Sequence, residues 1–200
     1  MRILTLVAVL LASSVHAAAA ASFRIQPGKP NLVRFVSKAP LETFEGKTTE
    51  VQGQVALDPA ALGDSIDAVV EVDLASLDTG LSLRNKHMRE NHLETKKFPK
   101  AIFRGGKISE LSRPNLEAGQ KTTFVLAGTF ALHGVEKPLN VPIELSPEPV
   151  EGSSGLRITA RFSVALADFK ISRPSFLVMQ LQEVQQVIVE LVATSAAPGP

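Results

Sequence analysis

Most of the chain alternates apolar and polar residues with a period of two, and this pattern constrains the fold more than any other feature. Successive side chains of a β-strand point to opposite faces, so the pattern predicts strands with one buried face. Residues typical of turns separate the segments that show it. These segments cover residues 33–35, 51–57, 66–74, 101–103, 124–132, 139–145, 156–166 and 187–191.

About eight strands with short connections are typical of an antiparallel sandwich or barrel. We favour an all-β antiparallel barrel, because closure hides the sheet edges and buries the apolar face. A barrel of this size is either filled by its own side chains or holds one small ligand. The periodicity does not decide between these alternatives.

One charged segment, from residue 81 to residue 97, breaks the period-two pattern. Its apolar residues are sparse, with Leu83, Met88 and Leu93 among them. We expect a small helical insertion here, made of one or two short helices that lie across an opening of the barrel.

The first 21 residues predict a secretory signal peptide. Arg2 supplies a positive start, residues 3–11 form an apolar run, and small residues follow, with cleavage expected between residues 17 and 21. A membrane anchor is the alternative, but the run is about half of the roughly 20 residues that span a bilayer. We therefore expect a periplasmic or secreted protein with a barrel domain over residues 22–194 and a disordered tail over residues 195–200.

The composition excludes several classes of function. The sequence has no cysteine, which excludes disulfides and thiolate chemistry, and its 21 basic and 20 acidic side chains disfavour a nucleic-acid binder. No nucleophile elbow, phosphate loop or dinucleotide motif is present. His87 and His92 are five residues apart, whereas metal-binding pairs on a helix are four apart. We expect no enzyme and no metal, and keep a centre at His87, Glu90 and His92 as the alternative.

Residues 74–103 carry a more specific signal. A strand ends in Ser76-x-x-Thr79, an Arg84-Asn85-x-His87-Met88 motif follows, and Phe98-Pro99 precedes Phe103 by a fixed spacing. This segment resembles the YceI-like family of exported lipid- and polyisoprenoid-binding proteins. Weaker matches in the correct order extend the resemblance over residues 22–194, including Gly128 to Val135. Asn31 and Glu136 depart from the residues common in the family.

The resemblance implies an extended, lipocalin-like antiparallel barrel with an apolar tunnel for a polyprenyl chain, a quinone or another amphiphilic lipid. No other cofactor is expected. The inward faces of the expected strands would supply the tunnel. Its expected lining is Val33, Phe35, Val55, Leu57, Val70, Val72, Phe103, Phe124, Leu126, Phe130, Ile158 and Phe162.

Arg84, Asn85 and His87 are the expected head-group residues at the tunnel mouth. For Arg84 and Asn85 an equal alternative is structural, since these two side chains can pin the insertion to the strand ends. The alternative function is a filled-barrel envelope stress or interaction module without a lipid, which would present an apolar patch outside. Val69, Val125, Ala127 and Ala131 would contribute to that patch.

Overall fold

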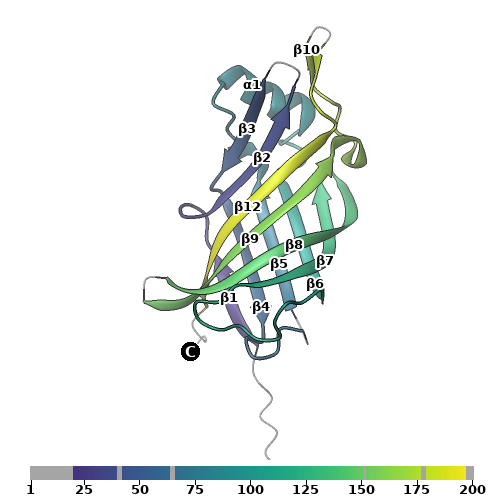
Figure 1. The fold of residues 1–200 in the computed structure, drawn as a ribbon. Coiled ribbons are helices and arrows are strands. Elements are labelled where there is room, and N and C mark those ends of the chain that lie inside the picture. Colours follow the sequence, from purple (N-terminus) through teal and green to yellow (C-terminus); the bar gives the residue numbers. More distant parts are fainter. Residues whose placement is uncertain (1–19, 40–41, 64–65, 151, 177–178, 197–200) are drawn as a thin grey trace, which may run out of the picture.

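A computed structural model describes residues 20–39, 42–63, 66–150, 152–176 and 179–196. Its main sheet contains ten antiparallel strands (Figure 1). The strands are β1 (Ala21–Ile25), β2 (Leu32–Lys38), β3 (Thr43–Thr48), β4 (Val51–Leu57), β5 (Ile66–Asp73), β6 (Lys100–Ser109), β7 (Thr122–Leu132), β8 (Val135–Val150), β9 (Ser153–Ala165) and β12 (Val184–Ser195). A separate hairpin pairs β10 (Ser175–Phe176) with β11 (Met179–Gln180).

Eight of these strands close into a barrel in the order β1-β4-β5-β6-β7-β8-β9-β12, and β12 pairs back onto β1. The predicted all-β antiparallel barrel with a small helical insertion is confirmed. The strand that closes the barrel, β1, was not predicted from the sequence. Its apolar residues Phe23 and Ile25 alternate over only five residues, beside the expected cleavage site. The expected strand at residues 33–35 is part of β2, which pairs with β12 above β1.

The barrel wall divides at one end. There β2 and β3 form a hairpin on β12, while the backbone of β3 pairs with the chain after β5 through an isolated bridge between Lys47 and Asp78. Three short helical segments fill this division: η1 (Leu74–Ser76), α1 (Ser82–His87) and the π-helical η2 (Met88–His92). Figure 1 shows α1 beside β3 at this end. We call residues 74–98 the lid.

Two loops cover the opposite end of the barrel. The Leu62 N–H donates to the Pro114 carbonyl (2.8 Å), and the Leu116 N–H donates to the Pro59 carbonyl (2.7 Å). Beneath these loops Leu57 and Leu62 are completely buried. The barrel therefore has a closed end at the loops and a lid end at α1.

The chain ends fall partly outside the described residues. The expected signal peptide lies there except for its last two residues, and so do residues 197–200. At the expected tail, Ser195 instead belongs to β12 and pairs with Phe23, because the closing strand β1 provides a partner for it. The Ala196 N–H also donates to the Ser22 carbonyl (2.8 Å). Within the described ranges, no helix has the length and hydropathy required to cross a bilayer.

Candidate functional site: an apolar cavity under the lid

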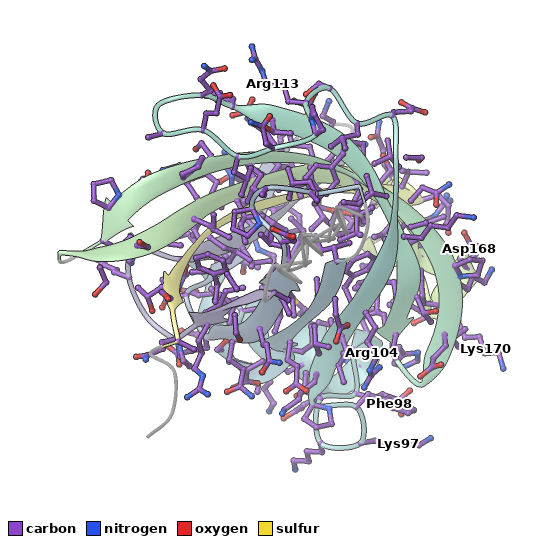
Figure 2. All side chains as sticks on the ribbon, turned by 90° about the horizontal axis from the view of Figure 1, so that it is seen from below. Lys97, Phe98, Arg104, Arg113, Asp168 and Lys170 are labelled. Carbon is purple, nitrogen blue, oxygen red and sulfur yellow. The ribbon has the colours of Figure 1, made fainter. Side chains whose placement is uncertain are left out.

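The barrel interior encloses a cavity of about 920 Å³. Its walls come from the inward faces of β2 to β9 and β12, and from the lid. Figure 2 views the molecule along the barrel from the closed end, with the strands around the interior. Leu81 and Leu83 line the cavity and are 55% and 66% exposed, so the cavity reaches the surface at the lid. The barrel is therefore not filled by its own side chains.

The structure places eleven of the twelve expected tunnel residues on the cavity wall. These are Val33, Phe35, Val55, Val70, Val72, Phe103, Phe124, Leu126, Phe130, Ile158 and Phe162. Leu57 lies outside the lining. It pairs with Ala21 and Ile66 at the closed end, where loops seal the barrel, and its side chain is completely buried there.

Small side chains keep the middle of the barrel open. Ala68 on β5 and Ala160 on β9 line the cavity, and four steps around the eight-stranded barrel separate their strands. These two alanines therefore project from opposite walls. Toward the lid the wall is aromatic, with the rings of Phe130 and Phe162 at 5.9 Å between centroids. A Cβ at Gly46 would overlap the Phe35 ring. The absence of a side chain at Gly46 therefore lets this ring pack directly on the backbone of β3.

Arg84 joins the lid to β3 at the rim of the cavity. Its Nη1 lies 2.8 Å from Glu42 Oε1, its Nε donates to Thr79 Oγ1 (3.0 Å), and its Nη2 donates to the Thr79 carbonyl (3.0 Å). Its guanidinium carbon lies 3.9 Å from the centre of the Phe44 ring. All four residues line the cavity. The side chain expected at the mouth is there, and it also holds the lid in place.

Asn85 is buried and lies outside the cavity lining. Its Oδ1 accepts from the Thr79 N–H (2.8 Å) and the Thr79 hydroxyl (2.7 Å), and its Nδ2 donates to Asp78 Oδ1 (2.7 Å). The Asn85 hydrogen bond and then the Gly80 N–H hold the pKa of Asp78 below its usual 3.8, because both stabilise the carboxylate. These contacts support the structural alternative for Asn85, which pins α1 to the chain segment that follows η1.

The second half of the motif holds the far side of the lid. The Phe98 ring packs edge-on against His133, with centroids 4.7 Å apart, and leaves no room for a Cβ at Gly134. Gly134 has φ +74°, which favours glycine. His133 Nε2 lies 3.1 Å from Glu94 Oε1, which ties the turn after η2 to the β7–β8 hairpin. Phe98 and Gly134 thus fix the position of the lid on the β7–β8 hairpin.

His87 and His92 both line the cavity at the lid end, and His87 is the exposed one. His92 Nδ1 lies 3.0 Å from the Ser172 carbonyl, so this nitrogen carries the hydrogen. In the part of the chain that the structure describes, no group of three His, Asp or Glu side chains is arranged to hold a metal ion. Sequence reasoning did not assign Glu42, Phe44 or Thr79 to the mouth. Thr79 belongs to the family motif, but no local pattern in the sequence indicates that these three residues meet at the rim of a cavity.

His92 should make the protein less stable in mild acid. Burial lowers the pKa of His92 below its ordinary 6.5, although the Ser172 carbonyl opposes this, and the nearby His87 lowers it further. The unfolded chain then binds a proton more tightly than the folded one, so stability is full above pH 6.5 and falls as the pH drops through this value. We expect His92→Asn, whose amide can still donate to Ser172, to lose less stability between neutral pH and about pH 5.5. Urea unfolding of both proteins measures this, and equal losses would contradict it.

Together, the closed antiparallel strands, the helical lid and the deep apolar cavity define an extended lipocalin-like binding barrel. The sequence profile of the YceI-like domain matches residues 23–193. The chain belongs to the YceI-like family. The resemblance noted in residues 74–103 is confirmed.

Curated relatives carry only the name UPF0312. One from Photorhabdus laumondii is 32% identical over 103 residues, which cover 50% of this chain and 49% of the relative. One from Vibrio cholerae is 30% identical over 133 residues, which cover 64% of this chain and 65% of the relative. The chain thus spans about half to two thirds of the length of the curated relatives it matches.

Solved structures share the fold at low identity. A polyisoprenoid binding domain from Saccharophagus degradans, implicated in plant cell wall breakdown, has a TM-score of 0.66 at 16% identity and covers 88% of this chain and 99% of that domain. BcnA of Burkholderia cenocepacia has a TM-score of 0.64 at 22% identity and covers 82% of this chain and 96% of BcnA. At these identities the likeness establishes the fold alone.

Proposed function

We propose that this protein binds one long-chain apolar lipid, a polyisoprenoid, a quinone or a fatty amphiphile, in the barrel cavity. The observation that carries the proposal is a continuous apolar cavity of about 920 Å³ that reaches the surface at one end. Its volume is at the upper end of the roughly 300–1,000 Å³ found for small-molecule pockets. Burial of an apolar chain contributes about 25 cal/mol per Å² of surface removed from water. The polyisoprenoid-binding domain with the same fold adds support.

The polar head of the lipid would lie at the lid end in this proposal. Glu42, Thr79, Arg84, His87 and His92 gather there on a wall that is mostly apolar. The charge of Arg84 is balanced by Glu42, and its Nε and Nη2 donate to Thr79, which favours a head that makes hydrogen bonds at a rim without net charge. His87 is exposed and is the residue we assign to direct head-group contact.

We also propose that the protein works outside the cytoplasm, in the periplasm or as a secreted protein, and carries or sequesters its lipid there. Support comes from the positive start, the short apolar run and the small residues at the N-terminus. A carrier suits such a compartment, because a polyprenyl chain is almost insoluble in the water between membranes.

The described residues give the filled-barrel alternative less support. Val69, Val125, Ala127 and Ala131 are each half-buried on the outer face, so the patch expected there is only partly exposed. Among the residues whose burial is described, the exposed large apolar side chains are Leu81, Leu83 and Val184, and two of these lie at the cavity rim.

A chain-length series tests the proposed function. Protein stripped of lipid by solvent extraction and refolded would be titrated with polyprenols of increasing length. We expect the affinity to rise by at least about tenfold with each added isoprene unit until the cavity is full, and then to level off. Equal affinities at all lengths would show that the chain is not buried, and affinities that rise without levelling off would indicate surface adsorption. No binding at any length would exclude a polyprenol chain as the ligand.

A further inference from the structure

The lid has an unusual surface for a protein that must stay in water. Leu81 and Leu83 are exposed and adjoin the mouth of the apolar cavity. Leu81 is the N-cap residue of α1 and makes no side-chain capping hydrogen bond. Ser, Thr, Asp and Asn are the residues that stabilise this position. A leucine that is 55% exposed there gains no capping and only part of its burial in the isolated protein, so it suggests a partner outside the chain.

Basic side chains adjoin these leucines on the same insertion. Lys86, Arg89, Lys96 and Lys97 surround one depression of the lid surface, together with Glu90 and Glu94. Leu83 and Lys86 are three residues apart on α1, so their side chains are neighbours on one helix face. The apolar rim and the basic depression therefore form one continuous surface, which we call the rim surface.

The charge of the rim surface differs from that of the rest of the chain. Residues 81–97 contain five Lys and Arg side chains and two Glu, a formal charge of +3. The whole sequence has a formal charge of +1, so the remaining residues total −2. Positive charge is thus concentrated on the lid beside the opening, whereas at the rim itself the charge of Arg84 is balanced by Glu42.

We propose that the rim surface docks on an anionic lipid bilayer. Leu81 and Leu83 would enter the boundary between head groups and acyl chains, and the lysines would face anionic head groups, as in interfacial helices. Each Lys or Arg near an anionic surface contributes attraction that salt screens. Docking brings the cavity opening against the membrane. Building on the proposed function, it would let a lipid pass between bilayer and cavity without exposing its chain to water.

Vesicle flotation with the host-processed protein tests this surface. The vesicles would be phosphatidylcholine with one quarter phosphatidylglycerol, compared with phosphatidylcholine alone, at low and high salt. We expect wild type to bind the anionic vesicles at low salt. Lys86→Glu with Lys96→Glu should weaken binding by at least roughly 30-fold, and Leu81→Ser with Leu83→Ser by about tenfold or more. These side chains are exposed, and serine is a favourable N-cap, so the variants should fold.

Matched controls separate this surface from general effects of charge and hydropathy. Lys107→Glu with Arg113→Glu reverses two exposed charges toward the closed end, where Figure 2 labels Arg113. Val184→Ser removes an exposed apolar side chain that does not line the cavity. Both controls should bind vesicles as wild type does. Wild type that stays in solution with anionic vesicles, or controls that lose as much binding as the lid variants, would overturn the proposal.

Lipid content, measured on the same preparations by mass spectrometry, distinguishes this proposal from the proposed function. Protein that docks through the rim surface but never carries lipid supports docking and contradicts the carrier function. Protein that carries lipid but does not bind anionic vesicles contradicts docking and leaves the carrier function intact.

Discussion

Replacing Ala68 and Ala160 together by phenylalanine should leave the barrel folded and abolish lipid binding. The two alanines project from opposite walls of the cavity, so two rings would meet across its middle. Large side chains destabilise a packed core, but here they enter open space. We expect the affinity for a long polyprenol to fall by at least roughly 100-fold, the loss from several CH₂ groups that can no longer be buried. A fluorescent polyprenol analogue measures the affinity, and circular dichroism and thermal unfolding check the fold.

The matched control for the plugged barrel is Ala127→Phe. Ala127 is on β7 and is absent from the cavity lining, so the same ring would be added outside. Lipid affinity should stay at the wild-type value. Retained affinity in the plugged protein would contradict a ligand in the middle of the barrel, whereas loss of affinity in both variants would point to a general effect of bulk on the sheet.

Asn85→Ala should be the most destabilising single change in the lid. The substitution removes three hydrogen bonds, and it leaves the N–H and the hydroxyl of the buried Thr79 without their acceptor. An unsatisfied buried donor costs about 1–3 kcal/mol. We therefore expect the free energy needed to open the lid to fall by about 3 kcal/mol in total. Faster amide exchange across residues 74–98 would report the opening, and the melting temperature would report any loss in the whole barrel.

Lys86→Ala is the control for the Asn85 variant, because Lys86 is the next residue of the same helix and is exposed. Lys86→Ala should change the free energy of lid opening by no more than about 0.5 kcal/mol. If the amide hydrogens of the lid exchange equally fast in the Asn85 and Lys86 variants, the buried Asn85 side chain does not hold the lid closed. The contacts of Phe98 and Arg84 would then hold it.

Much of the barrel could be predicted because a strand shows in the sequence which face it buries. Phe124, Leu126 and Phe130 on β7 alternate with half-buried residues, and the structure places all three on the cavity wall. The family motif likewise located the lid. Leu57 shows the limit of this reasoning, since it follows the same alternation but ends at the sealed end of the barrel.

What could not be predicted depends on residues that meet from distant parts of the chain. Strand β1 closes the barrel by pairing with β12, and no local pattern indicates a partner that far away. The ion pair of Glu42 with Arg84 spans 42 residues in the same way. Whether the barrel is filled or hollow depends on which small side chains face each other. Ala68 and Ala160 do so only once the strand order is known.

The most direct test of the central claim is the mass of what travels with the protein from its own host. The protein would be purified without denaturant and measured by native mass spectrometry, before and after organic extraction. A cavity of about 920 Å³ that serves a lipid predicts one isoprenoid, quinone or fatty amphiphile per chain, with the plugged Ala68 and Ala160 variant empty. Wild-type protein that is folded and empty from its host, and that binds no added lipid, would contradict the claim.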